Sequence, residues 1–261
     1  MLNKSIIALL GLLMLNVACA EQKSEGQQNS GQAPEVIRER LLEARPDLNL
    51  GEVRPSPIEG LYQVQVVGGP ILYVTPKGDM MIAGDLLAIG PGGFSRVEDP
   101  YLVEKRQEAL AALDPSESID FKPEGETKAV VYVFTDVDCG YCRRLHQQIE
   151  AYRDGGRELP GYRDLGIEIR YLAYPRAGVN SSSGEKLVTA WCADDQQGTM
   201  DRLKHMQPVP GKSCDDHPVA KHFRLGADLG VSGTPALLMP DGRLVAGYLP
   251  PADLARMLEL D

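Results

Sequence analysis

The chain has 261 residues, of which 27 are Lys or Arg and 37 are Asp or Glu, so its formal net charge is −10. This length allows one or two domains with a sizeable core, and 43% hydrophobic and 25% charged residues are typical of a globular protein. An acidic chain with four histidines lacks the basic surface of a general nucleic-acid-binding protein. We therefore expect no nucleic acid as a partner, and the five cysteines become the informative residues.

Residues 1–20 have the pattern of a secretory signal peptide. Lys4 supplies a positive charge, residues 6–15 form an apolar run, and Ala18-Cys19-Ala20 fits a small-x-small cleavage site. This run is too short to span a bilayer as a helix, which leaves a buried core helix as the alternative. The Gln/Ser/Gly-rich stretch that follows favours the signal peptide, and export places the chain where disulfides persist.

Cys19 leaves two interpretations of the N-terminus open. Residues 15–19 are similar to a bacterial lipoprotein signal, in which the cysteine is lipidated, but Asn16 stands where such signals usually carry Leu. We favour a soluble protein in the periplasm over a lipid anchor at Cys19, and we expect residues 21–33 to form a flexible tail. With either N-terminus four cysteines remain for thiol chemistry.

Two parts precede the cysteine motif. Residues 34–98 begin with a helix over 34–44 and continue over 53–89 as short antiparallel strands between Gly and Pro turns. Such a small sheet can bury only one face by itself, so we expect it to pair with a second copy. Asp99-Pro100 is a helix start, and apolar residues at helical spacing predict a linker helix over 99–114.

Residues 115–261 predict a third part with the order β-α-β-α-β-β-α, so the fold class is α+β. The continuous apolar run 128–134 is typical of a strand buried on both faces, and Leu145, Ile149 and Tyr152 predict a helix after it. We expect a second strand over 167–172, a largely helical insert over 184–226, a hairpin with an Asp-Gly turn, and a closing helix over 251–260.

The sequence Cys139-Gly140-Tyr141-Cys142 has the context of a thioredoxin-type redox motif, because it follows a buried strand and begins a helix. A helix N-terminus stabilises a thiolate, so we expect Cys139 to attack a substrate disulfide and Cys142 to resolve the mixed disulfide. Gly140 lets a substrate chain approach closely. The alternatives are an inert disulfide or a zinc site, which would need four converging thiols.

Charged residues of both signs lie next to this motif, so the sequence does not determine whether their net effect favours a thiolate. Arg143 and Arg144 add positive charge, whereas Asp136 and Asp138 oppose it. The four histidines (146, 205, 217 and 222) show no ligand spacing, and we expect neither a metal ion nor a cofactor. His146 lies one turn beyond Cys142, where it could tune the thiols; a packed or exposed helix residue is the favoured interpretation.

Thr234-Pro235 is the second chemical element. As in thioredoxin-like proteins, we expect a cis bond before Pro235 that faces the cysteines and exposes the Thr234 backbone for pairing with a substrate chain. A trans proline that begins a strand is the alternative.

Cys192 and Cys214 remain, 22 residues apart in the insert. Four cysteines allow three pairings, and two of these would consume the redox pair. We therefore predict a structural Cys192–Cys214 disulfide worth about 3 kcal/mol by loop closure. Two free buried thiols are the alternative, and Trp191 is expected in the core.

From about residue 34 to the end, and most strongly after 128, the chain resembles the DsbC family of periplasmic disulfide isomerases. The segments that carry the resemblance are Phe134-Thr135-Asp136, residues 139–142, Leu145-His146, residues 174–178, 191–193, 213–215 and 230–235, Gly247-Tyr248 and Pro250-Pro251. The related DsbG type usually has Pro in place of Gly140. Arg143-Arg144 departs from the family, which often has His-Lys there.

The resemblance implies a thioredoxin-like domain in which Cys139 and Cys142 are catalytic and Gly140, Tyr141, Thr234 and Pro235 bind substrate. It also implies a V-shaped homodimer joined by the N-terminal sheets, and reduction by the membrane thiol reductant DsbD. The predicted function is periplasmic isomerisation of wrong disulfides in misfolded exported proteins. A net thiol oxidase or reductase, and a chaperone that binds unfolded chains in the dimer cleft, are the alternatives.

Overall fold

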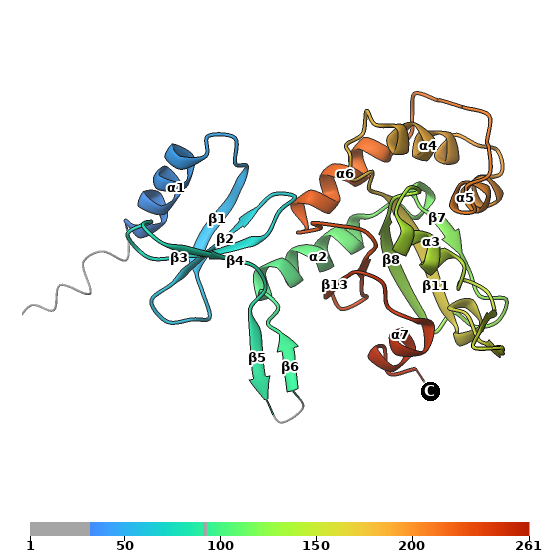
Figure 1. Cartoon of the computed structure of the whole chain (residues 1–261), viewed down its shortest axis with the longest axis horizontal. Helices are drawn as coiled ribbons and strands as arrows, with labels where there is room; N and C mark the ends of the chain where they lie inside the picture. The colour runs from blue at the N-terminus through green and yellow to red at the C-terminus, as the bar shows by residue number, and fades with distance from the viewer. Residues whose placement is uncertain (1–31, 91–92, 261) are drawn as a thin grey trace, which may run out of the picture.

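The computed structural model describes residues 32–90 and 93–260, so the predicted signal peptide and Cys19 lie outside the described residues. Figure 1 shows two sheets, one formed by the N-terminal part and one by the C-terminal part, with helix α2 (Pro100–Ala112) running between them. Within residues 32–90 and 93–260, no helix combines the length and the hydropathy needed to cross a bilayer.

The N-terminal part is a four-stranded antiparallel sheet in the order β1-β2-β3-β4, covered on one face by a helix. Its elements are α1 (Ala33–Ala44), β1 (Leu50–Pro55), β2 (Tyr62–Val66), β3 (Ile71–Val74) and β4 (Met81–Ala83). Ile37 and Leu41 of α1 are buried against Val53, Val64 and Leu72 of the sheet. The helix and the short strands expected here are confirmed.

A second hairpin follows that the sequence analysis did not predict. Strands β5 (Leu87–Gly90) and β6 (Gly93–Arg96) pair with each other and form a separate two-stranded sheet. In Figure 1 this hairpin projects away from both larger sheets. Its apolar side chains are exposed: Ile89 is 84% and Phe94 is 74% accessible.

Helix α2 makes polar contacts with both larger parts. Asp99 caps it by accepting the Tyr101 N–H at 3.1 Å, and the same carboxylate accepts two hydrogen bonds from Arg54 at 3.0 and 2.6 Å. Arg106, which is 4% exposed, donates through Nε to the carbonyl oxygen of Leu229 at 2.9 Å. Because the buried polar groups of Arg106 are paired across this contact, α2 is fixed against the C-terminal part.

The C-terminal part contains a mixed five-stranded sheet in the order β13-β12-β8-β11-β7. β8 and β11 are parallel, and the other neighbours are antiparallel. The strands are β7 (Ile119–Phe121), β8 (Ala129–Thr135), β11 (Ile167–Ala173), β12 (Ala236–Leu238) and β13 (Leu244–Ala246). The α+β class and the strands expected over 128–134 and 167–172 are therefore confirmed.

Strand β8 is buried on both faces, as its continuous apolar sequence predicts. Val131 and Val133 face the core under helices α3, α4, α5 and α7. Tyr132 and Phe134 face the opposite core, against which Leu110 of α2 packs. Successive side chains of a strand point to opposite faces of the sheet, so neighbouring residues of β8 belong to different cores.

The α-helices of the C-terminal part cover this sheet. They are α3 (Gly140–His146), α4 (Ser182–Trp191), α5 (Gln196–Lys204), α6 (Val219–Asp228) and α7 (Pro251–Met257), with short 3-10 turns at Pro115–Glu117 and Arg163–Leu165. The insert is helical as expected, with an irregular stretch between α5 and α6.

The helix predicted through Tyr152 is shorter than expected. α3 ends at His146, and Tyr152 belongs instead to a small hairpin of β9 (Tyr152–Asp154) and β10 (Arg157–Leu159). The turn of this hairpin is Gly155-Gly156, with φ of +55° and +77°. Two glycines at positive φ favour a tight hairpin turn, and this local preference outweighs the helical spacing of the apolar residues.

Candidate functional site

Cys139 lies at the N-cap of α3, at the end of the loop that follows β8. Its Sγ accepts a hydrogen bond from the backbone N–H of Cys142 at 3.4 Å. Both cysteines are free thiols, and Cys139 is 3% and Cys142 is 1% exposed. The N-cap position directs the unpaired N–H groups and the positive end of the helix dipole towards the first sulfur.

The Thr234–Pro235 peptide bond is cis, as expected, and it lies against the first cysteine. The Cys139 thiol donates to the carbonyl oxygen of Thr234 at 3.2 Å. The Thr234 hydroxyl is buried and has no hydrogen-bond partner among the described residues. The structure thus brings Cys139, Cys142, Thr234 and Pro235 together, although 92 residues separate Cys142 from Thr234 (234 − 142).

The environment lowers the pKa of Cys139 from 9.0 to about 5. The largest cause is the hydrogen bond from the Cys142 thiol, and the Cys142 N–H and the charge of Arg176 act in the same direction, against burial. At neutral pH the first sulfur is therefore a thiolate, which is the nucleophilic form in thiol–disulfide exchange.

Cys142 has the opposite behaviour. Burial, followed by the hydrogen bond that it gives to Cys139, raises the pKa of the Cys142 thiol far above its ordinary value. The second sulfur therefore stays protonated while the first is ionised, and the two thiols have different chemical roles within one motif.

Lys204 is a residue of this site that the sequence analysis missed. Its side chain is 1% exposed, and Nζ donates to Oγ1 of Thr135 at 2.5 Å and to the carbonyl oxygen of Asp136 at 3.1 Å. Burial lowers the pKa of Lys204, and its charge acts to lower the pKa of Cys142. The only sequence signal was its spacing from Met200, which places Lys204 on the apolar face of α5.

Both aspartates that precede the motif are paired with cations. The Asp136 carboxylate, 3% exposed, accepts the Arg176 N–H at 2.9 Å and Nε at 3.2 Å, as well as the Asp138 N–H at 2.8 Å. Asp138 pairs with Lys186 at 2.8 Å. Their opposition to a thiolate is thus offset by partners that lie far away in the sequence.

The remaining residues of the motif differ in exposure. Gly140 is exposed, and Tyr141 is 62% exposed beside the buried sulfurs. Arg143 donates to the carbonyl oxygen of Val137, and Arg144 lies over the Tyr248 ring at 5.0 Å. The charge of Arg176, which lies outside the motif, is among the causes that lower the pKa of Cys139.

Cys192 and Cys214 form a disulfide, which is the pairing that the cysteine count favoured. It joins the end of α4 to the irregular stretch before α6, and it leaves the redox pair free. Trp191 lies in the core beside it, with Nε1 donating to the carbonyl oxygen of Glu117 at 2.6 Å.

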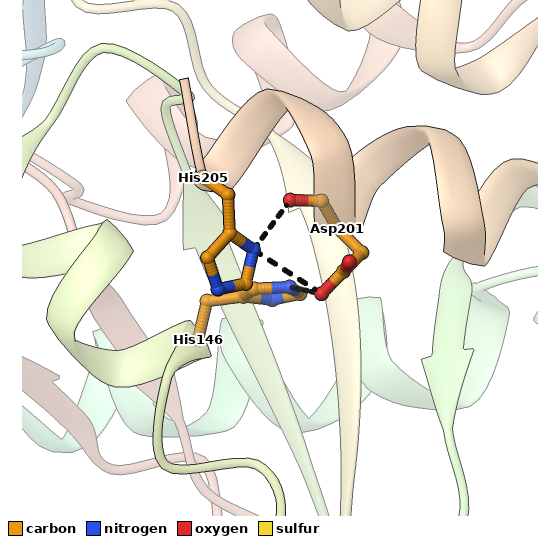
Figure 2. Close-up of side chains that lie close together, drawn as sticks. All are labelled: His146, Asp201 and His205. Carbon is orange, nitrogen blue, oxygen red and sulfur yellow. Dashed lines mark hydrogen bonds and ion pairs between the residues drawn. The ribbon is translucent and has the colours of Figure 1, made fainter. Parts of the chain in front are cut away.

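His146 is a packed helix residue, which is one of the two forms of the favoured interpretation. The side chains that surround it could not be recognised from spacing along the sequence. It lies close to Asp201 of α5 and to His205, the C-cap of that helix, and one donor atom from each residue lies within 4.8 Å of the others (Figure 2). Burial lowers the pKa of His146 to about 3, so its ring is neutral at pH 7. His217 and His222 lie outside this cluster.

Comparisons with known proteins match both parts of the chain to described families. Residues 116–260 match the thioredoxin-like domain family, and residues 20–93 match the N-terminal domain of disulfide bond isomerase proteins. The chain is also similar to a structure of a disulfide interchange protein from Neisseria gonorrhoeae, at 29% identity and a TM-score of 0.45, over 56% of this chain and 96% of that one.

Two curated relatives are similar over nearly the whole chain. The thiol:disulfide interchange protein DsbC of Escherichia coli K12 is 35% identical over 228 residues, which cover 87% of this chain and 89% of the relative. DsbC of Pasteurella multocida is 32% identical over 250 residues, which cover 96% and 95%. With its paired cysteines at the start of α3 and this similarity along both parts, the chain belongs to the DsbC family of thiol:disulfide interchange proteins.

Proposed function

We propose that this protein is a periplasmic thiol:disulfide isomerase with Cys139 as its nucleophile. The observation that carries the proposal is the difference between two neighbouring thiols: the pKa of Cys139 is lowered to about 5, whereas that of Cys142 is raised. One sulfur is ready to attack at neutral pH, and the other retains its proton until it is needed.

In the proposed reaction the Cys139 thiolate attacks one sulfur of a non-native substrate disulfide. A mixed disulfide forms, the substrate disulfide breaks, and the second substrate sulfur leaves as a thiolate. When that or another substrate thiolate attacks the mixed disulfide, a new substrate disulfide forms and Cys139 is released unchanged. If this step stalls, Cys142 attacks instead, which oxidises the enzyme and reduces the substrate.

The proposed substrate-binding surface surrounds the cysteines. The backbone of Thr234 before Pro235 would pair with an extended segment of a misfolded exported protein. Exposed Gly140 and Tyr141 would contact the same segment, since Gly140 presents no side chain and Tyr141 is 62% exposed. A strand-like mode suits an enzyme with many substrates, because backbone hydrogen bonds do not depend on the substrate sequence.

Refolding of a scrambled ribonuclease by the reduced enzyme tests these roles. We expect Cys139→Ser to abolish reactivation, and Cys142→Ser to retain part of it while covalent adducts accumulate on gels. Gln147→Ser, an exposed position just after the same helix, is the matched control and should behave as wild type. Undiminished isomerisation by Cys139→Ser would exclude the proposal, and net oxidation by protein whose cysteines are mainly oxidised in cells would favour the oxidase.

We further propose that residues 34–98 form a dimerisation domain, joined by a linker helix over 99–114 to a catalytic domain over 115–261. The support is exposed apolar surface on the last three strands of the N-terminal part. β4 is an edge strand of its sheet, and β5–β6 is a short hairpin. The large apolar side chains exposed there are Met80, Met81, Ile82, Leu87, Ile89 and Phe94. Apolar residues on an unpaired edge favour pairing with a second copy of the chain.

Light scattering after size-exclusion chromatography tests the homodimer. Phe94→Asp is expected to give a monomer that still reduces small disulfides but isomerises protein substrates poorly. Ile58→Asp, at an exposed position outside this surface, should remain a dimer. A wild-type monomer in solution would refute this part of the proposal.

We also propose that the protein is kept reduced by the membrane reductant DsbD, because an isomerase must begin its cycle as a dithiol. The redox state of Cys139 and Cys142 in cells with and without the reductant tests this. Mass spectrometry of the exported protein tests where the mature chain begins. A lipid on Cys19 would show that the protein is anchored to a membrane.

A further inference from the structure

A cluster of two imidazoles and one carboxylate lies at the far end of the helix that carries the cysteines. His146 is the last residue of α3, Asp201 lies in the last turns of α5, and His205 is the C-cap of α5. Asp201 and His205 are four residues apart and so share one face of their helix. Figure 2 shows both side chains turned towards His146.

The spacing of the donor atoms suits a tetrahedral metal ion. Oδ1 of Asp201 is 3.4 Å from Nε2 of His146 and also 3.4 Å from Nδ1 of His205. With metal–ligand bonds of about 2.0–2.1 Å, two ligand atoms on a tetrahedral zinc ion lie about 3.3 Å apart. Two of the three ligand separations are therefore close to those of a zinc site, and binding would require Nδ1 of His205 to leave the Asp201 carbonyl oxygen that it contacts at 2.9 Å.

The buried member of the cluster is held in place by a second contact. Nδ1 of His146 lies 3.0 Å from the hydroxyl of Tyr171, a residue with no exposed surface. When Nδ1–H donates to this hydroxyl, the lone pair of Nε2 points towards the Asp201 carboxylate. A hydrogen bond on the second imidazole nitrogen is the usual way in which proteins orient a metal-binding histidine.

The backbone and the exposure of the cluster also favour a cation. His146 and His205 both lie at helix C-termini, where unpaired carbonyl groups give the backbone a partial negative charge. The side chains of Asp201 and His205 are 56% and 41% exposed, so an ion can enter from solvent. A fourth coordination position would face water.

We propose that His146, Asp201 and His205 bind one borderline divalent metal ion, with Zn²⁺ as the ion that the ligand set fits best. Two imidazoles with one carboxylate are typical of zinc, whereas Mg²⁺ and Ca²⁺ prefer oxygen ligands throughout. The bound ion would join the end of α3 to α5, and so connect the helix of the redox motif to the helix that carries Lys204. The redox function proposed above does not depend on this site, and the site does not depend on that function.

Cobalt binding to the full chain without a histidine tag tests the proposal, after Cys139 and Cys142 have been oxidised to a disulfide and any other thiol alkylated. Removal of free thiols leaves only nitrogen and oxygen ligands. We expect one Co²⁺ per chain, visible bands of a four- or five-coordinate ion, and displacement by one equivalent of Zn²⁺. Calorimetry with Zn²⁺ gives the affinity.

Variants locate the ion. His205→Ala and Asp201→Asn replace exposed side chains, and each should weaken zinc binding by at least about a hundredfold. Tyr171→Phe, which retains the ring but removes the hydroxyl, should weaken it by about 10- to 100-fold. His217→Ala and Asp194→Asn, outside the cluster, are the matched controls and should bind as wild type. Unfolding curves establish that each variant is folded.

Two results would overturn the proposal. One is the absence of stoichiometric binding by the oxidised chain, and the other is an affinity that His205→Ala and Asp201→Asn leave unchanged. If only the reduced protein binds Co²⁺, with sulfur-to-metal charge-transfer bands, the cation is held by the cysteines and the cluster is not its site.

Discussion

The ammonium group of Lys204 lies 2.5 Å from the hydroxyl oxygen of Thr135, in a position with 1% solvent exposure. This contact joins helix α5 of the insert to the last residue of β8, four residues before the nucleophilic cysteine. A buried cation is costly unless it is hydrogen-bonded or opposed by a negative charge. The nearby thiols supply that charge once one of them ionises.

Replacement of Lys204 by Met should therefore slow the resolving step. Without the buried positive charge, the already raised pKa of Cys142 rises further, and less thiolate is available to attack a mixed disulfide. The measurement is the rate at which a preformed mixed disulfide between Cys139 and a fluorescent peptide resolves, followed against pH. Lys221→Met, which removes a lysine that pairs with Glu117 at the surface away from the cysteines, should change this rate little. An unchanged rate in Lys204→Met would contradict the assignment.

The low pKa of Cys139 should be measurable and should depend on the hydrogen-bond donor at position 142. Thiolate absorbance near 240 nm, or the rate of alkylation, is expected to titrate with a midpoint of about 5 in the reduced protein. Cys142→Ser retains a donor, whereas Cys142→Ala removes the largest cause of the shift. The midpoint should therefore be higher in Cys142→Ala than in Cys142→Ser, and equal midpoints would show that the second side chain is not the main cause.

The same shift makes the stability of the reduced protein depend on pH. The folded-state pKa of about 5 lies below the unfolded value of 9.0, so the unfolded chain binds more protons between these values. The stabilisation is complete above about pH 9 and is lost as pH falls towards 5, by up to about 1.4 kcal/mol per pH unit. Urea unfolding of reduced wild type against reduced Cys139→Ser isolates this contribution. A difference that stays constant from pH 5 to 8 would argue against the thiolate.

Replacement of Arg106 by Met should destabilise the contact between α2 and the C-terminal part. The guanidinium donates to the carbonyl oxygen of Leu229 at 2.9 Å and to Glu98 at 3.0 Å, and the substitution leaves these acceptors without a partner. We expect a loss of about 1–3 kcal/mol in the free energy of unfolding. Lys105→Met, at the partly exposed neighbouring position, removes one longer hydrogen bond to the Asp228 carbonyl oxygen at 3.2 Å and should cost less than about 0.5 kcal/mol.

The local features of the fold could be predicted because short-range physics determines them. The apolar run that became β8, the Asp99 cap of α2 and the position of Cys139 at the start of α3 all follow from neighbouring residues. The end of α3 could not be predicted, because the Gly155-Gly156 turn competes with helical spacing and only the packed structure decides between them. The β5–β6 hairpin was not predicted because its apolar side chains are exposed, so they do not follow the pattern of one buried and one exposed face.

The long-range part of the site lay beyond sequence reasoning. Arg176 and Lys204 lie 37 and 65 residues after Cys139 (176 − 139 and 204 − 139), too far for local spacing to connect them with it. His146 and His205 are 59 apart (205 − 146), so spacing along the chain gives no sign that they meet. Such pairs are determined by how α5 packs beside α3, and this depends on the whole core. The cysteines themselves were recognisable because their chemistry needs adjacent residues.

Strand β8 separates two hydrophobic cores, one packed under the helices around the cysteines and the other packed against α2. Its odd-numbered side chains support the helices around the cysteines, and its even-numbered side chains face the core that receives α2. Phe134 lies in the core that contacts α2, and the next residue, Thr135, accepts the hydrogen bond from Lys204 Nζ. Strand β8 therefore contributes side chains both to the core on which α2 packs and to the contact that holds Lys204, while Arg106 joins α2 to the C-terminal part directly.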